Sequence, residues 1–526
     1  MSTSDHERPV RFDKSRRRVP GRDVTDWPRW AQPPSNVRCL DPSMAPVVDD
    51  IRPLPTAYIG PRLLISETSD DRARSAIDGA AERLSWTLSY ENEGKDHGHR
   101  RGVQRIDISV TPGSVSPPPD GWVLLQNARA LAGRESLRGV GLDHVLDMHP
   151  MESNPFHVSN PFHVSDPFHV SNPTAADLSS PVDSYSFPGS GGRQPIAYAG
   201  GAPHRLPDYA GRRPVVAILD TGCGSHDWLN DVVRTDLRLD QEVVGYDNPA
   251  TDPELHGDLV GALDGVIDPD SGHGTFIAGL IHQGCPDADI LSWRIAPSWG
   301  PIVESDLISA LKQIAELAQR GRDGEEGGQI IDVLCLSMGY YHETPLDPQF
   351  DSPYLEALQD ISRTGTLIVC SAGNDATTRP SFPAAFAPWS SGKPPVVVDP
   401  ACPPIVSVGA LNPNRATDAL FSNTGPWVTC YALGAAVMST FPDTFQGGLE
   451  PLARTTTAVG RSRASIDPDD FRGGFGVWSG TSFAAPVMAA RLAAKIAESL
   501  AEGDDPGTAV SRARAAVEVV TATPPD

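Results

Sequence analysis

Apolar residues in the second half of the chain occur in short continuous runs rather than in alternation with polar ones. These runs lie at about residues 214–219, 330–336, 365–371 and 405–408. A strand that is apolar on both faces is covered on both sides, which is typical of a parallel sheet. Between these runs, helices are predicted over about residues 274–282, 306–319 and 353–363. The pattern therefore predicts a three-layer α/β domain with βαβ connections over residues 214–526.

The longest apolar pattern in this domain starts near Ser482. Residues 483–490 are almost entirely apolar, and apolar side chains then recur every four residues as far as Leu500. Gly480 allows a tight turn into this helix. The pattern predicts a buried helix with an exposed hydroxyl, that of Ser482, at its first turn. Free backbone N–H groups and the positive end of the helix dipole would lie beside it, which suits an anionic intermediate.

A smaller pattern over residues 56–148 precedes this domain. Its predicted elements are a strand at 57–65, a helix at 71–84, a strand at 86–90, a strand at 103–110, a helix at 120–132 and a strand at 140–146. The order β-α-β-β-α-β is that of a ferredoxin-like α+β unit.

Two segments lack such periodicity. Residues 1–55 are rich in Arg, Asp and Pro and are predicted to be a largely irregular lead-in. Residues 149–213 are predicted to be a Pro/Ser/Gly-rich linker, in which the hexapeptides NPFHVS, NPFHVS and DPFHVS start at Asn154, Asn160 and Asp166. So short a unit forms no core, and its repeated histidines are interpreted as part of a spacer rather than as a metal site.

Charge and apolar content argue against several classes of function. The chain has 526 residues, with 67 acidic against 43 basic side chains and a net charge of -24. Such a charge disfavours binding to nucleic acid or to an anionic membrane. No apolar run reaches the roughly 18 residues of a transmembrane helix, and the N-terminus shows no apolar core of a secretory signal. We expect a cytoplasmic location, although export by another route stays open.

The cysteines agree with a reducing compartment. There are seven, without CxxC spacing, so at least one is unpaired. Cys335 and Cys370 lie inside apolar runs, which is typical of reduced core residues. A disulfide among the others stays open.

Three residues form a candidate constellation for acyl transfer. Asp220 directly follows a predicted buried strand, and His273 lies between two glycines where a helix begins. A Ser hydroxyl is a weak nucleophile until a His takes its proton, and a carboxylate on the other ring nitrogen fixes the tautomer of that His. Asp220, His273 and Ser482 together supply these groups.

Four motifs carry a family resemblance. DTG at Asp220, HGT at His273, SAGN ending at Asn374 and SGTSFAAP around Ser482 occur in this order. The chain resembles the subtilisin-like (subtilase) serine peptidases over about residues 214–500, a family with this Asp, His, Asn, Ser order.

The resemblance implies a role for each motif residue. Ser482 would attack the scissile carbonyl, His273 would act as general base and then as general acid, and Asp220 would orient His273. The Asn374 side chain and the Ser482 backbone N–H would donate to the oxyanion.

Substrate-binding residues are implied in the same way. The segment LSMG is similar to the family segment that pairs with an extended substrate and forms one wall of the S1 pocket, and Ala-Gly before Asn374 would form the other. The residues concerned are Ser337, Met338, Gly339, Ala372 and Gly373. SFPAAF from Ser381 is similar to the base of this pocket, and its small residues predict room for a sizeable apolar P1 side chain.

The resemblance implies a serine endopeptidase that cleaves polypeptides through an acyl-enzyme and requires no cofactor or metal. Calcium binding stays open, but no calcium loop is recognised in the sequence. A non-catalytic peptide-binding relative is one alternative, although all three triad residues are present. An esterase or another acyl hydrolase is a second alternative.

The sequence departs from the family at several positions. Phe276 stands where many relatives have a second His, and VTCYALG from Val428 replaces a more usual ending. Residues 388–400 and 441–474 are extra, and we expect them to shape or cover the cleft.

The N-terminal region has two interpretations. Residues 56–148 resemble, in element order and position, the propeptide that inhibits many subtilases and is cut off, so the chain would be a self-processed zymogen with its own N-terminal region as intramolecular inhibitor. The alternative is a permanent partner-recognition domain of a regulated peptidase.

Overall fold

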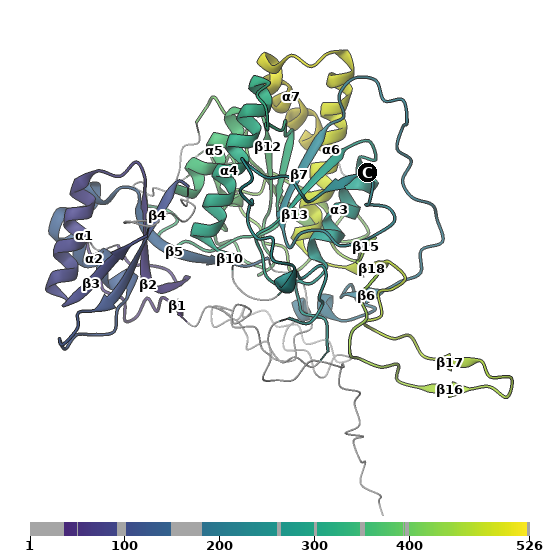
Figure 1. Ribbon diagram of the computed structural model, residues 1–526, viewed down its shortest axis with the longest axis horizontal. Helices are drawn as coiled ribbons and strands as arrows, with labels where there is room; N and C mark the ends of the chain where they lie inside the picture. Colours follow the sequence, from purple (N-terminus) through teal and green to yellow (C-terminus); the bar gives the residue numbers. More distant parts are fainter. Residues whose placement is uncertain are drawn as a thin grey trace, which may run out of the picture.

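The protein is described here by a computed structural model covering residues 36–49, 51–91, 101–148, 181–259, 265–298, 302–347, 353–392, 394 and 399–522. Figure 1 shows a small N-terminal domain beside a larger α/β domain, with α4 and α5 of the larger domain facing the smaller one. The predicted fold class, a parallel-sheet α/β domain preceded by a ferredoxin-like α+β domain, is confirmed.

The N-terminal domain has the predicted element order. Its elements are β1 (Val37–Cys39), β2 (Ala57–Ser66), α1 (Asp71–Arg83), β3 (Trp86–Tyr90), β4 (Val103–Val110), α2 (Gly121–Ala132) and β5 (Val140–Leu146). The antiparallel sheet has the order β5-β2-β4-β3, and β1 pairs with β2. Side chains alternate along β2, so Leu63 and Ile65 pack with α1 and α2 while Leu64 joins the core around α4. The second face of this sheet is thus a contact with the larger domain.

The larger domain is built on a seven-stranded sheet in the order β14-β13-β12-β11-β7-β9-β8. Its strands are β7 (Val215–Asp220), β8 (Val233–Arg234), β9 (Asp289–Arg294), β11 (Val333–Leu336), β12 (Leu367–Ser371), β13 (Val406–Leu411) and β14 (Cys430–Leu433). All neighbouring strands are parallel. The continuous apolar runs are thus explained, because both faces of each central strand are covered.

Helices cover both faces of this sheet. They are α3 (His273–Gly284), α4 (Glu304–Asp323), α5 (Pro353–Arg363), α6 (Thr481–Glu502) and α7 (Ala509–Ala522). Along β7, Ala217 and Leu219 belong to the core with α4 and α5, whereas Val216 and Ile218 belong to the core with α3 and α6. This arrangement places the starts of α3 and α6 at the carboxyl edge of the sheet, where functional residues of such folds gather.

The remaining strands are short and antiparallel. They are β6 (Gln194–Pro195), β10 (Ile302–Val303), β15 (Val437–Thr440), β16 (Arg454–Thr456), β17 (Ser462–Ala464) and β18 (Phe475–Trp478). The extra segment 441–474 contains the β16–β17 hairpin, which extends away from the body in Figure 1.

Two segments predicted as irregular contain ordered contacts. Part of the lead-in forms β1, and the second half of the predicted linker packs on the larger domain, where β6 pairs with β18. Arg193 adds hydrogen bonds from its guanidinium to four backbone carbonyls of residues 267–271. Composition did not predict these contacts because they depend on partners far away in the sequence. The hexapeptide repeats lie outside the described residues.

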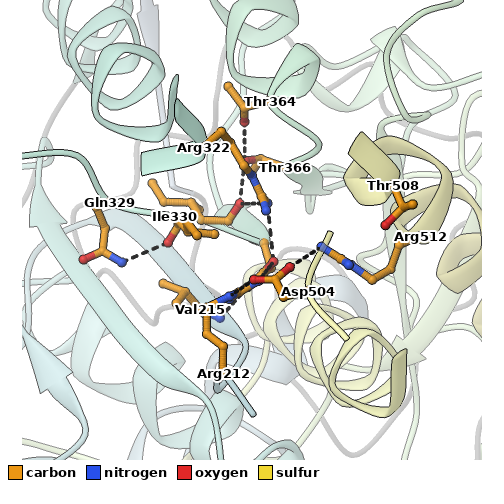
Figure 2. A network of polar contacts seen from close by, with 12 residues as sticks. Arg212, Val215, Arg322, Gln329, Ile330, Thr364, Thr366, Asp504, Thr508 and Arg512 are labelled. Carbon is orange, nitrogen blue, oxygen red and sulfur yellow. Dashed lines mark hydrogen bonds and ion pairs between the residues drawn. The ribbon is translucent and has the colours of Figure 1, made fainter. Parts of the chain in front are cut away.

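A charged network stabilises the edge of the sheet opposite the carboxyl ends (Figure 2). Asp332, just before β11, accepts hydrogen bonds from the Arg212 guanidinium at 2.6 Å and from the Val215 backbone N–H at 2.9 Å. Arg212 also donates to Asp504, which in turn accepts from Arg512. The end of the predicted linker is thereby connected to β7, β11 and the α6–α7 connection.

The described part of the chain contains neither a disulfide nor a membrane-spanning helix. All seven cysteines are free thiols, and Cys335 and Cys370 are buried. No helix in the described part of the chain is both long and apolar enough to cross a membrane.

Candidate active site

Asp220 and His273 form a buried pair at the carboxyl edge of the sheet. Asp220 ends β7 and His273 begins α3, and both side chains are fully buried. His273 Nδ1 lies 2.8 Å from Asp220 Oδ1, which also accepts the Thr221 backbone N–H at 2.8 Å. The carboxylate therefore fixes the ring so that Nε2 is the nitrogen left for a reaction. His273 Nε2 is buried and has no hydrogen-bond partner within the described chain.

Ser482 is the second residue of α6 and is fully buried, so the expectation of an exposed hydroxyl is wrong. The reason is a segment of the N-terminal domain that covers it. Ser482 Oγ donates a hydrogen bond to the Met148 carbonyl oxygen at 2.7 Å and lies 3.4 Å from the Ser337 carbonyl oxygen. The hydroxyl is thus directed at the covering backbone and not at His273 Nε2.

Asn374 lies just beyond β12, next to the start of α6. Its Oδ1 accepts the Thr481 backbone N–H and the Thr481 hydroxyl, both at 2.8 Å. A backbone N–H can only donate, so these bonds fix which branch of the amide carries the oxygen. The Nδ2 donor is therefore oriented by Thr481, as a preorganised oxyanion donor requires.

Residues 145–148 run through the site as an extended strand between two segments of the larger domain. On one side Asp147 and Gly339 form an antiparallel bridge, with N–H to carbonyl distances of 3.0 and 2.9 Å. On the other side β10 pairs with β5, opposing Ile302 to Leu146 and Val303 to Val145. The segment after β11 that was predicted to bind extended substrate here binds the chain's own backbone.

The predicted pocket residues surround this strand. Met148 is 2% exposed and shares one apolar cluster with Met338 and Ala372. Ser337 follows β11 and its hydroxyl donates to the Ser482 carbonyl at 2.8 Å. A Cβ on Gly339 would lie only 2.6 Å from Ser381 Oγ. A glycine therefore permits the segment after β11 to approach the SFPAAF segment, which begins at Ser381.

Gly373 also lies beside the site. Its backbone N–H donates to the Thr481 hydroxyl at 3.0 Å, and its φ of +102° favours glycine. It therefore connects the end of β12 to the start of α6, close to Asn374.

Glu254 is a buried carboxylate beside the Asp220–His273 pair that the sequence interpretation missed. It is 1% exposed and accepts hydrogen bonds from the Gly274 backbone N–H at 3.1 Å, from the Thr275 hydroxyl at 2.5 Å and from the Thr221 hydroxyl. It thus joins the residues that follow Asp220 and His273. Its surroundings in the sequence, TDPELHGD, are typical of a solvated loop, so no local signal distinguishes it.

Burial raises the pKa of Glu254 to about 7, against an ordinary value of 4.5, although the bonds from Thr221 and Thr275 oppose the rise. Between pH 4.5 and 7 the folded state therefore binds more protons here than the unfolded state, and stability falls as pH increases. The loss, present in full above pH 7, reaches about 3 kcal/mol.

We expect Glu254→Gln to remove this pH dependence. The test measures the free energy of unfolding in urea for the parent and for the Gln variant, both carrying Ser482→Ala. The stability of the Gln variant relative to the parent should be higher at pH 8 than at pH 4.5 by about 3 kcal/mol. Glu326→Gln, at an exposed position, is the matched control. Equal pH dependence in the two Gln variants would contradict the expectation.

Comparison with known proteins decides the family. The subtilase family model (Peptidase_S8) matches residues 211–517, more than half of the chain. The chain belongs to the subtilase family. Family membership makes this subtilase a serine peptidase, a hydrolase whose substrates are polypeptides.

Two curated relatives agree with this assignment. The major intracellular serine protease of Bacillus subtilis (strain 168) is 23% identical over 271 residues, covering 49% of this chain and 69% of the relative. Mycosin-4 of Mycobacterium tuberculosis is 28% identical over 308 residues, covering 54% of this chain and 55% of the relative. The match thus spans only part of each relative.

Solved structures of low identity are also similar. A cold adapted subtilisin-like serine proteinase has 20% identity and a TM-score of 0.36, with 58% of this chain and 85% of that chain covered. Fervidolysin from Fervidobacterium pennivorans, a keratinolytic enzyme related to subtilisin, has 18% identity and a TM-score of 0.45, with 88% and 57% covered.

Proposed function

We propose that this subtilase is a serine endopeptidase made as a zymogen, which cuts its own chain after Met148. The observation that carries the proposal is the 2.7 Å hydrogen bond between Ser482 Oγ and the Met148 carbonyl oxygen. A backbone carbonyl at the nucleophile, held in an extended strand, is how a peptide bond would be presented for cleavage.

The proposed reaction uses the residues at the site. Ser482 Oγ would leave its hydrogen bond to the Met148 carbonyl oxygen, transfer its proton to His273 Nε2 and attack the Met148 carbonyl carbon. Asp220 would stabilise the resulting imidazolium. The carbonyl oxygen becomes an oxyanion, for which the Asn374 amide and the N–H groups at the start of α6 are the available donors. Collapse would break the bond between residues 148 and 149 as the His273 imidazolium gives its proton to the leaving amine, and the acyl-enzyme left behind would be hydrolysed by a water that His273 deprotonates.

The N-terminal domain fits the role of intramolecular inhibitor. Asp143 on β5 accepts hydrogen bonds from the Ser305 backbone N–H at 3.0 Å and from the Ser305 hydroxyl at 2.9 Å. A carboxylate at these first residues of α4 is also favoured by the helix dipole. With the β5–β10 pairing, these contacts support retention of the domain over the cleft.

A comparison of the N-termini of two purified proteins tests the proposal. We expect the wild-type protein to yield a new N-terminus at residue 149, seen by mass spectrometry, and Ser482→Ala to remain intact. An uncut wild-type chain that hydrolyses added peptides would contradict self-processing but not peptidase activity. Failure of wild type to hydrolyse any peptide while hydrolysing esters would favour an acyl hydrolase.

The buried Met148 side chain also predicts the specificity. If Met148 occupies the S1 pocket, peptides with Met or Leu at P1 should be cleaved with a kcat/KM about 10-fold or more above those with Asp or Lys, because a fully buried side chain of this size contributes roughly 1.5–3 kcal/mol. A P1-varied peptide library measures this. Preference for a charged P1 side chain would contradict it.

A further inference from the structure

Two histidines and one glutamate lie together at the junction of the two domains, with His144 and Glu343 buried and His342 partly buried. His144 comes from β5 of the N-terminal domain, whereas His342 and Glu343 follow β11 in the peptidase domain. Their potential ligand atoms all lie within 4.8 Å of one another. The peptidase reaction proposed above uses none of these side chains.

The distances are close to those of a metal site. His144 Nε2 lies 2.8 Å and His342 Nδ1 lies 3.6 Å from the same Glu343 oxygen, Oε2. A tetrahedral Zn²⁺ with bonds of about 2.0–2.1 Å has ligand atoms roughly 3.3 Å apart. Small shifts of these side chains would therefore admit the ion. Binding at His342 Nδ1 replaces the hydrogen bond that this nitrogen accepts from the Thr344 backbone N–H at 2.9 Å.

A fourth residue orients one of the histidines. Glu304 Oε2 lies 2.6 Å from His144 Nδ1 and is positioned to accept its proton, which leaves Nε2 to face Glu343 and His342. Zinc-binding histidines usually donate their second N–H to a carboxylate in this way. Glu304 and His144 are only 4% and 3% exposed, so this orientation is held inside the protein.

Ligand type favours zinc over calcium or magnesium. Two imidazoles and one carboxylate suit Zn²⁺, whereas the harder cations prefer oxygen ligands alone. With both imidazoles neutral, the two charges of Zn²⁺ equal those of Glu304 and Glu343. Without the ion, the two ring nitrogens of His144 lie 2.6 and 2.8 Å from Glu304 and Glu343. Zinc would take the place of the hydrogen bond between His144 Nε2 and Glu343.

We propose that His144, His342 and Glu343 bind one Zn²⁺ that fastens the N-terminal domain to the peptidase domain. The site is four residues from Met148, so the ion would hold the inhibitory strand in the cleft. This regulatory consequence rests on the proposed zymogen, whereas zinc binding itself does not. At free zinc 100 times Kd, dissociation of a cleaved N-terminal domain is suppressed about 100-fold.

The test uses the full chain with Ser482→Ala, so that no self-cleavage occurs. Each protein is treated with chelator and then dialysed to equilibrium against Zn²⁺, and its zinc content is measured by elemental analysis. The Ser482→Ala parent should bind one more zinc per chain than the same protein with His342→Gln. His144→Gln should lose the same equivalent, and His204→Gln, outside the junction, should keep it. Circular dichroism in chelator checks that each variant is folded. The variants also correct for zinc bound by the other histidines.

Two further readouts separate a site from a structural contact. Zn²⁺ should raise the Tm of the parent but not that of His342→Gln, and Co²⁺ should give the visible absorption of a tetrahedral site only in the parent. Equal zinc content in parent and His342→Gln would overturn the proposal and leave His144 as a hydrogen-bonded bridge between Glu304 and Glu343. If the wild-type chain proves uncut but zinc binds, only the zymogen is wrong.

Discussion

Replacing Ser482 with Ala is expected to abolish peptide hydrolysis and the cut after Met148 while leaving the fold intact. The expected loss in kcat is about 10⁶-fold, a size taken from the same replacement in subtilisin. The hydroxyl makes one short hydrogen bond, to the Met148 carbonyl oxygen, and its loss costs only about 1 kcal/mol of stability. The backbone bridge between Asp147 and Gly339 holds the strand in place in either case.

The measurement follows hydrolysis of a peptide substrate and the mass of the purified chain over time. Circular dichroism and unfolding by urea show whether the Ala variant is folded. Ser511→Ala, at an exposed hydroxyl on α7, is the control and should keep wild-type activity. Hydrolysis by Ser482→Ala at more than a small fraction of the wild-type rate would exclude Ser482 as the nucleophile.

The parallel sheet could be predicted because its signal is local. A strand covered on both faces must be apolar at every position, and the helix predicted over residues 353–363 has the observed bounds of α5. The ends of β7 and β12 then locate Asp220 and Asn374 at one edge of the sheet. The motifs identify the family, and the fold of that family then implies the strand order and the pairing of Asp220 with His273.

Contacts between distant parts of the chain could not be predicted in this way. Ser482 and Met148 are 334 positions apart, and the short hydrogen bond of the buried hydroxyl is made across this separation. The pairing of β5 with β10 is a second case, because β10 has only two residues and shows no strand pattern. The sequence around Glu254 and His144 does not indicate that they are buried, since polar and ionisable side chains are ordinarily expected to be exposed.

Replacing Asp220 with Asn is the second large effect we expect. Asp220 Oδ1 accepts hydrogen bonds from His273 Nδ1–H and from the Thr221 backbone N–H. The side chains of Asp220 and His273 are both fully buried. An amide can donate toward Nδ1, which would favour the tautomer with the proton on Nε2 and leave that nitrogen unable to act as a base. The same change in chymotrypsin-like enzymes lowers kcat about 10⁴-fold, and we expect a loss of that order here.

The Asn variant separates orientation of the histidine from binding of substrate. KM should change little, because the hydrogen bonds of Asp220 go to His273, Thr221 and the backbone of residues 295–296, away from residues 145–148, and kcat should carry the loss. Asp236→Asn, at an exposed carboxylate, is the matched control. A fall in activity of less than about 10-fold, or one confined to KM, would mean that Asp220 does not set the tautomer of His273. The hydrogen bond at 2.8 Å would then be structural only.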